Sequence, residues 1–67
     1  MEKEQWGRKI RAFRKLKGYT QAGLAKKLDI SLSQLGEIER ENRKPDSELI
    51  RKICATLDVS VTEMKNL

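Results

Sequence analysis

The chain has 67 residues, of which 15 are lysine or arginine and 10 are aspartate or glutamate, with one cysteine and no histidine. A chain this short forms one domain with a marginal core, because it buries only about 60% of its unfolded surface. The lone Cys54 excludes an internal disulfide and a multi-cysteine zinc site, and it suits the reducing cytoplasm. Without histidine, a metal centre or histidine-based catalysis is not expected. The sequence shows neither a membrane-spanning apolar run nor a signal peptide.

The positive charge lies in the first part of the chain. Residues 1–28 carry nine lysines and arginines against two acidic residues, whereas residues 29–67 carry six against eight. The basic part fits a phosphate-facing surface, and a solvated helix face would have the same composition. Charge alone does not separate the two.

The apolar spacing predicts a first helix from about Gln5 to Lys17, with a stop at Gly18. Its expected inward positions are Trp6, Ile10, Phe13 and, at the end, Leu16. Trp6 has two interpretations. It either packs on the core between the first and last helices or contacts a second copy of the chain.

Residues 20–40 are typical of two short helices, at about 21–28 and 32–40, joined by a tight turn. Thr20 and Ser31 have hydroxyl groups that can cap these helices, and Gln34 can complete a capping box with Ser31. The apolar positions form one face on each helix, with one further residue in the turn: Leu24, Ala25, Leu28, Leu35, Ile38 and, in the turn, Ile30. This pattern predicts a helix-turn-helix, whose second helix can enter a DNA major groove.

A loop closed by Pro45 leads to a fourth helix, at about 47–57, that Asp46 can cap. Its expected buried face comprises Leu49, Ile50, Ile53, Cys54 and Leu57. A capping box at Ser60 and Glu63 opens a short fifth helix whose inward residues are Val61 and Met64. No segment alternates as a strand would, so the sequence predicts an all-α fold of five helices.

Short motifs at regular spacing run through residues 7–64: Ile10-Arg-x-Phe-Arg14, Lys17-Gly-Tyr-Thr-Gln21, Leu24-Ala25, Leu28-x-Ile-Ser31, Ser33-x-Leu-x-x-Ile-Glu-Arg40, Arg43-x-Pro45 and Leu49 through Leu57. Together and in this order they resemble the Xre family of bacterial and phage regulators, which includes the Cro and lambda-repressor DNA-binding domains. The resemblance implies that residues 1–67 form a single compact lambda-repressor-like domain. It also implies binding to operator DNA, commonly as a dimer.

The chain departs from the family pattern at three helix ends. Asp29, Glu41 and Asp58 stand where family members usually carry glycine. If these positions keep a left-handed backbone, aspartate adopts it at a modest cost and glutamate at a larger one. Gly23 and Gly36 fall inside the second and third helices, where each costs about 1 kcal/mol relative to alanine.

The outer face of the third helix is expected to meet DNA, and the resemblance implies that base-reading positions lie there: Leu32, Ser33, Gly36 and Glu37. Leu32 suits a thymine methyl group, Ser33 suits either type of base, and Glu37 suits a cytosine amino group. Gly36 either permits close backbone approach or leaves its position unread. The alternatives are an exposed or interface leucine at position 32, and a salt bridge from Glu37 to Arg40 or to a loop cation.

The resemblance places a phosphate contact at Gln21, where the side-chain amide and the helix N-terminus meet the anion. The alternative for Gln21 is a solvent-facing residue. Further phosphate candidates, which would set register rather than sequence preference, are Gln34, Arg40, Asn42, Arg43 and Lys44. The family also carries a partly buried ion pair at the positions of Arg14 and Glu39, which would fix the recognition helix. The alternative is an exposed pair.

The sequence therefore favours a sequence-specific transcriptional regulator, a repressor that binds a partly palindromic operator as a homodimer. The expected dimer surface lies at the C-terminus: Val61, Met64 and Leu67. The alternative is a protein-binding module, such as an antitoxin or a partner of an anti-repressor, which the acidic run Glu37, Glu39 and Glu41 favours.

No enzyme, metal, cofactor, membrane or small-molecule ligand is implied. The expected partners are double-stranded DNA, a second copy of the chain and, in addition, a regulatory protein. The expected location is the cytoplasm, at the nucleoid.

Overall fold

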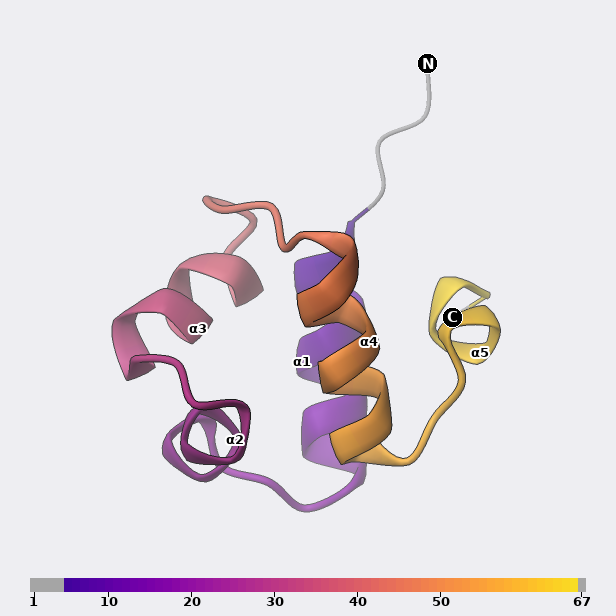
Figure 1. The fold of residues 1–67 in the computed structure, drawn as a ribbon, viewed down its shortest axis with the longest axis horizontal. Coiled ribbons are helices and arrows are strands. Elements are labelled where there is room, and N and C mark those ends of the chain that lie inside the picture. Colours follow the sequence, from indigo (N-terminus) through magenta and orange to yellow (C-terminus); the bar gives the residue numbers. More distant parts are fainter. Residues whose placement is uncertain (1–4, 67) are drawn as a thin grey trace.

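The computed structural model describes residues 5–66, and every regular element in that range is a helix. The helices are α1 (Trp6–Leu16), α2 (Gln21–Leu28), α3 (Leu32–Glu39), α4 (Ser47–Leu57) and α5 (Val61–Lys65). In Figure 1, α1 and α4 occupy the centre, α2 and α3 lie on one side of them and α5 lies on the other. The predicted all-α architecture is confirmed, the first four helices begin and end within one residue of their predicted bounds, and α5 begins directly after its predicted cap at Ser60.

Four helices begin at a side-chain cap. Oxygen atoms of Thr20, Ser31, Asp46 and Ser60 each accept from the N–H three residues further along the chain. At α5 the capping box is complete, because the Glu63 carboxylate also accepts from the Ser60 N–H at 3.0 Å. At α3 the described residues show only the Ser31 half of the expected box. These caps are local, which is why the sequence located the helix starts.

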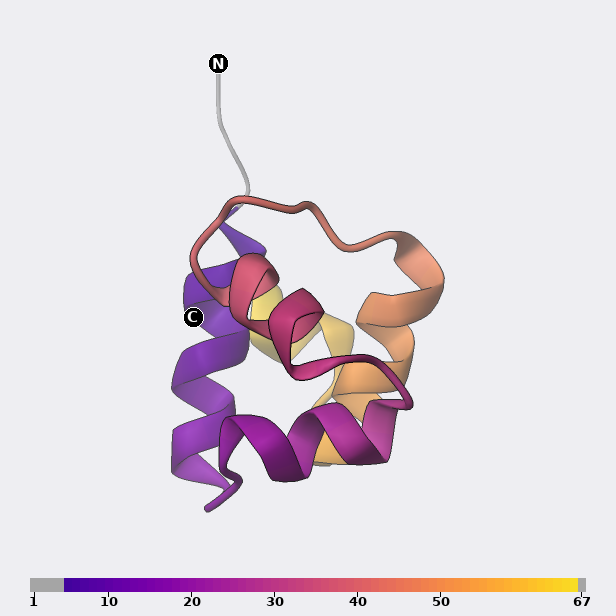
Figure 2. The same ribbon diagram turned by 90° about the vertical axis from the view of Figure 1, so that its left-hand side faces the viewer.

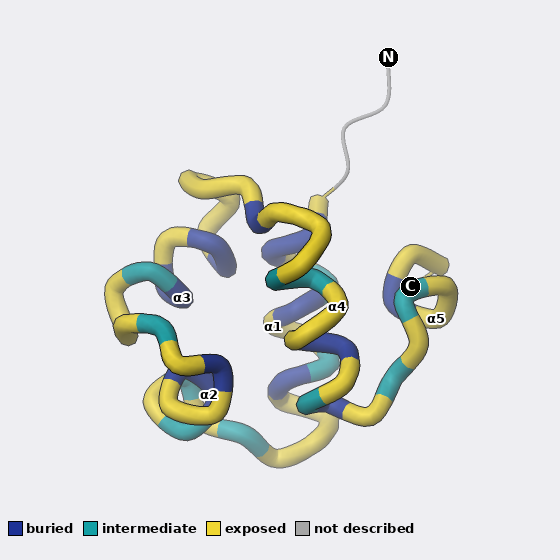
Figure 3. Tube along the Cα trace, in the orientation of Figure 1, coloured by how far each residue is buried: buried dark blue, intermediate teal, exposed yellow. Residues whose placement is uncertain are grey.

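One hydrophobic core joins all five helices. Each helix supplies at least one side chain with no exposed surface: Ile10, Leu24, Leu35, Ile53 and Met64. Figure 3 shows the buried positions on the sides of the helices that face one another. Burying one such side chain is worth roughly 1.5–3 kcal/mol, so the core dictates how the short helices pack.

Two expectations about apolar side chains are wrong. Leu16 is 74% exposed, because it lies six residues after Ile10 and so points about 120° away from it around the helix. Met64 is fully buried, as its predicted inward position requires, and it holds α5 to the core, so its second assignment, to a dimer surface, is wrong. Val61 is half-buried against the core, and Leu67 lies outside the described residues.

Trp6 and Cys54 are core residues. Trp6 is 6% exposed, and the ammonium of Lys9 lies 5.8 Å from its ring centroid and donates to the Lys65 carbonyl at 2.7 Å. These contacts join α1 to α5, as the first interpretation of Trp6 proposed. Cys54 is 3% exposed, and burial raises the pKa of its thiol above its ordinary value. A raised pKa leaves little reactive thiolate, as expected for a packing residue.

The three departures from glycine all keep a left-handed backbone. The φ angles are 60° at Asp29, 66° at Glu41 and 59° at Asp58. Glu41 has a second contact, because its Oε2 accepts from the N–H of Arg8 at 2.9 Å. Arg8 is the third residue of α1, and Gln5, at the N-cap of that helix, makes no side-chain cap. Glu41, which follows the C-terminal end of α3, therefore caps the N-terminus of α1.

Candidate nucleic-acid interface

The outer face of α3 is open and its inner face is buried. Leu35 and Ile38 have no exposed surface, whereas Leu32 is 52% exposed and Ser33 and Glu37 are exposed as well. Figure 2 views the molecule from this side, with α3 in front and α2 below it. Three of the four expected base-reading residues thus share one surface of a helix that projects from the domain.

Gly36 is not part of that open surface. It is buried, and the Arg40 guanidinium lies over it, with Nη1 3.2 Å from where a Cβ would stand. The close backbone approach needs an open glycine and is not seen here, whereas the alternative that this position is left unread agrees with the burial of Gly36. A ligand approaching this turn of α3 meets the Arg40 side chain before the glycine backbone.

Arg14 and Glu39 join α1 to the C-terminal end of α3. Arg14 donates from Nε to Glu39 Oε2 at 2.7 Å and from Nη2 to Oε1 at 3.1 Å, and the two side chains are 9% and 2% exposed. A third donation runs from Arg14 Nη1 to the Tyr19 carbonyl at 2.8 Å. The pair is buried and bidentate, so the alternative of an exposed pair does not hold.

Gln21 extends this network to α2. Its Nε2 donates to Glu39 Oε1 at 3.0 Å, so one carboxylate ties together three helices. The sequence assigned the Gln21 amide to a phosphate, but in the structure the amide nitrogen bonds the carboxylate. The amide nitrogen keeps a second N–H, so the predicted phosphate contact of Gln21 stays a prediction, and the first turn of α2 adds N–H groups at the positive end of the helix dipole.

A hollow of about 580 Å³ opens beside that first turn, lined by Arg11, Arg14, Thr20, Gln21, Glu39 and Arg40. Arg14 is neutralised by Glu39 within the fold, whereas Arg11 and Arg40 are exposed. Two exposed guanidinium groups at a helix N-terminus favour an anion such as a phosphate. Arg11 was not among the predicted phosphate contacts. The available signal was its position three residues before Arg14, on the same side of the helix.

The loop between α3 and α4 adds further polar side chains to this edge. Asn42, Arg43 and Lys44 are exposed there, and Gln34 is half-buried on α3. Arg43 Nε lies 3.7 Å from Glu37 Oε1, with the side chains 52% and 48% exposed. A surface pair of this kind is worth less than about 1 kcal/mol, so it does not hold Glu37 away from a base.

The position of α3 against α1 depends on Gly7. A Cβ at this position would overlap the Ile38 carbonyl oxygen and would lie 3.1 Å from both the Glu39 carbonyl oxygen and the Glu41 Cδ. Only glycine allows the two backbones to approach this closely. No sequence pattern indicates this role, since Gly7 lies in the first turn of a helix without a recognisable motif.

The part of the chain that the structure describes contains no cluster of three or more histidine, cysteine, aspartate or glutamate residues able to hold a metal ion. None of the helices in residues 5–66 is long and apolar enough to cross a membrane.

A family model described as helix-turn-helix matches residues 10–64, most of the chain. The chain belongs to the helix-turn-helix family. This helix-turn-helix chain is 59% identical over 64 residues to YazB, an uncharacterized HTH-type transcriptional regulator of Bacillus subtilis (strain 168), covering 96% of the chain and 93% of YazB. It is 41% identical over 56 residues to the regulator SinR of the same strain, covering 82% of the chain and 50% of SinR.

Solved structures show the same relationship. The fold matches a crystal structure of SinR in complex with DNA, in which SinR is described as the master regulator for biofilm formation. The TM-score is 0.80 at 38% identity, and the match covers 88% of this helix-turn-helix chain and 95% of that one. A SinR–SinI complex matches with a TM-score of 0.78 at 39% identity, covering 87% and 57%. The predicted Xre-type, lambda-repressor-like domain of a DNA-binding transcriptional regulator is therefore confirmed.

Proposed function

We propose that this protein represses transcription by binding a partly palindromic operator as a homodimer. In this arrangement α3 of each copy enters one of two successive major grooves about 34 Å apart. One observation carries the proposal. The open face of α3, with Ser33 and Glu37, projects from a domain in which the buried Arg14–Glu39 pair fixes that helix.

Three residues on α3 are proposed to read bases. Ser33 lies in the first turn, where it suits either type of base, and Glu37 follows one turn later, where it accepts from a cytosine amino group. Leu32 is 52% exposed and contacts a thymine methyl group. The Glu37 carboxylate also repels phosphates, so it lowers non-specific affinity while sharpening base selectivity.

The proposed phosphate contacts fall into two groups. The first comprises Arg11 and Arg40 at the hollow and the first turn of α2 at Gln21. The second comprises exposed loop residues and one amide on α3: Asn42, Arg43, Lys44 and Gln34. Contacts of this kind fix register on the duplex and supply most of the salt-dependent affinity.

The dimer is proposed to assemble on the operator, with one copy on each half-site. This geometry needs only a small interface between the two copies. A small interface suits this domain, because Met64 is buried in the core and cannot contribute to it. We further propose that the protein acts on nucleoid DNA in the cytoplasm, without catalysis, cofactor or small-molecule effector. Its control then comes from its own concentration or from a protein partner. The SinR–SinI complex is a solved case of a similar chain bound to another protein.

The test is a fluorescence-anisotropy titration against DNA from upstream of the protein's own gene, beside scrambled DNA, at two salt concentrations. A specific regulator prefers its operator by about a thousandfold or more. Ser33→Ala and Glu37→Ala should alter which bases are preferred. Equal, strongly salt-dependent binding to both DNAs would contradict base reading by α3 at this site, and no binding to either would contradict the function.

A further inference from the structure

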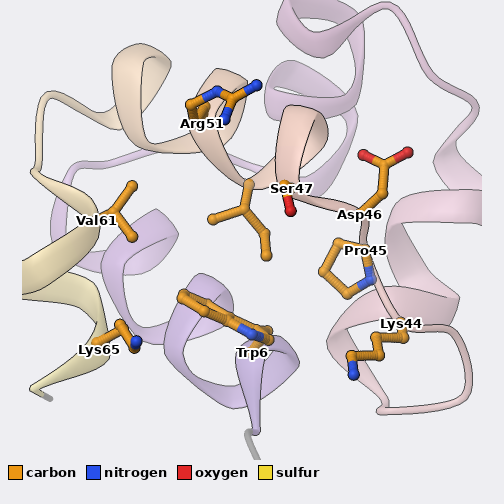
Figure 4. Close-up of a pocket in the computed structure, with 9 residues that line it drawn as sticks. Trp6, Lys44, Pro45, Asp46, Ser47, Arg51, Val61 and Lys65 are labelled. Atoms are coloured by element: carbon orange, nitrogen blue, oxygen red, sulfur yellow. The ribbon is translucent and has the colours of Figure 1, made fainter.

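A second hollow lies on the α5 side of the molecule. It is a groove of about 690 Å³ between the starts of α1 and α4 and the helix α5. The residues that line it are Trp6, Lys44, Pro45, Asp46, Ser47, Ile50, Arg51, Val61 and Lys65. Figure 4 shows the Trp6 ring between Val61 and Lys65 on the α5 side and Pro45 and Lys44 on the loop side. The groove thus combines an apolar floor with a charged rim.

The rim is cationic. Three of the lining residues, Lys44, Arg51 and Lys65, are cations and all are exposed, whereas Asp46 is the one carboxylate. That carboxylate is used within the fold, because its Oδ1 accepts from the Leu49 N–H at 2.8 Å as the cap of α4. The rim therefore attracts negative charge, while Ile50, Val61 and the edge of Trp6 favour apolar side chains.

We propose that this groove docks an acidic segment of a partner protein that places apolar side chains over Ile50 and Val61, beside the Trp6 ring. A second copy of the chain fits less well, because two grooves facing each other would bring two cationic rims together. A single-stranded nucleic acid also fits less well. Base stacking needs an open aromatic face, and Trp6 is only 6% exposed.

Lys44 connects this groove to the proposed DNA-binding surface. The same side chain lines the groove and belongs to the loop beside α3 that we assign to phosphate contacts. An acidic segment in the groove competes with DNA for Lys44, so docking weakens operator binding. This consequence rests on the proposed function, whereas docking itself does not.

The experiment uses the full chain and a short synthetic peptide in which one leucine and one phenylalanine stand among glutamates. The matched control peptide has lysine in place of every glutamate. Trp6 is the only tryptophan in the chain, so its fluorescence reports directly on the groove. Amide resonances measured by NMR give the location of binding. We expect the glutamate peptide to change the Trp6 emission and to shift amides in residues 46–51 and 61–65, and the lysine peptide to leave both unchanged.

Two charge reversals test the rim. Arg51→Glu replaces an attraction by a repulsion and should weaken the glutamate peptide about tenfold. Lys15→Glu reverses an equally exposed cation on α1 outside the groove and should change peptide affinity less than about twofold. Arg51 is not among the proposed DNA contacts, so Arg51→Glu should keep its operator affinity within about twofold.

Several results would overturn the docking proposal. The first is that neither peptide binds, or that the lysine peptide binds as well as the glutamate peptide. The second is that the shifted amide resonances lie on α2 or α3 instead of the groove. The third is that Arg51→Glu leaves the affinity for the glutamate peptide unchanged. Groove amides that shift on dilution, with a dimer mass in sedimentation, would assign the groove to a second copy instead. The DNA titration is separate. Peptide binding without DNA binding defeats only the proposed function, and an operator affinity that saturating peptide leaves unchanged defeats only the connection through Lys44.

Discussion

At the scale of single residues, Arg14 makes the largest individual contribution that we expect outside the apolar core. Arg14→Ala leaves the Glu39 carboxylate buried with only the Gln21 amide as its partner. Removing one member of a buried pair costs about 3–5 kcal/mol. Urea unfolding followed by circular dichroism measures this loss of unfolding free energy. The matched control is Arg43→Ala, which breaks an exposed pair and should cost less than about 1 kcal/mol. Equal losses in the two variants would mean that burial of the Arg14 pair is unimportant.

Glu41 combines a helix cap with an unfavourable backbone conformation. Its carboxylate caps α1, while its φ of 66° carries the strain of a left-handed residue. Glu41→Ala keeps the strain and removes the cap, so it should lower the unfolding free energy by about 1 kcal/mol. Glu41→Gln keeps an acceptor oxygen and should recover most of that loss.

Glu41→Gly completes the comparison, because it removes both the cap and the strain. It should be more stable than Glu41→Ala by about 1–2 kcal/mol. Thermal unfolding of the four proteins in one buffer ranks them. An alanine variant as stable as the original protein would show that Glu41 has no capping role.

At the scale of helices, two glycines that look alike in the sequence have opposite roles. Gly7→Ala forces α1 and α3 apart, because the new Cβ overlaps the Ile38 backbone carbonyl. We expect this variant to be destabilised and to lose operator affinity. Gly36→Ala meets only the mobile end of the Arg40 side chain, so it should gain up to about 1 kcal/mol of stability from helix propensity. Unfolding curves of both variants decide this, and a stable Gly7→Ala would contradict the close crossing of the two helices.

The difference between local interactions and contacts between helices explains how well the helices could be predicted. Caps such as Ser31 and Asp46 act three residues along the chain, and apolar spacing acts over one or two turns, so helix bounds were predicted closely. Leu16 was wrongly placed inward because its exposure depends on which other helix lies beside it, and Met64, correctly placed inward, was wrongly assigned to a dimer surface as well. Gly36 was misassigned because its cover is a side chain one turn away whose direction the sequence does not specify.

At the scale of the whole molecule, the proposed DNA-binding surface combines Arg11 on α1, the first turn of α2 and the α3–α4 loop. Affinity for DNA falls with salt by about 0.9 in log–log slope for each phosphate neutralised. Lys44→Ala should therefore weaken binding to all DNA sequences and reduce that slope by about this amount. Titrations at several salt concentrations measure it, with Lys15→Ala on α1 as the exposed control. An unchanged slope in Lys44→Ala would remove Lys44 from the phosphate contacts.

The sequence by itself determined the five helices, the family and the open face of α3, because these depend on periodicity, caps and motifs within a few residues. It also gave the Arg14–Glu39 pair, through the family resemblance. Only the tertiary structure decided the cap from Glu41 to α1, the crossing at Gly7, the bond from Gln21 to Glu39 and the groove over Trp6. Each of these joins residues from different helices, as Arg8 and Glu41 do across 33 positions, and such distances are fixed by core packing rather than by local pattern.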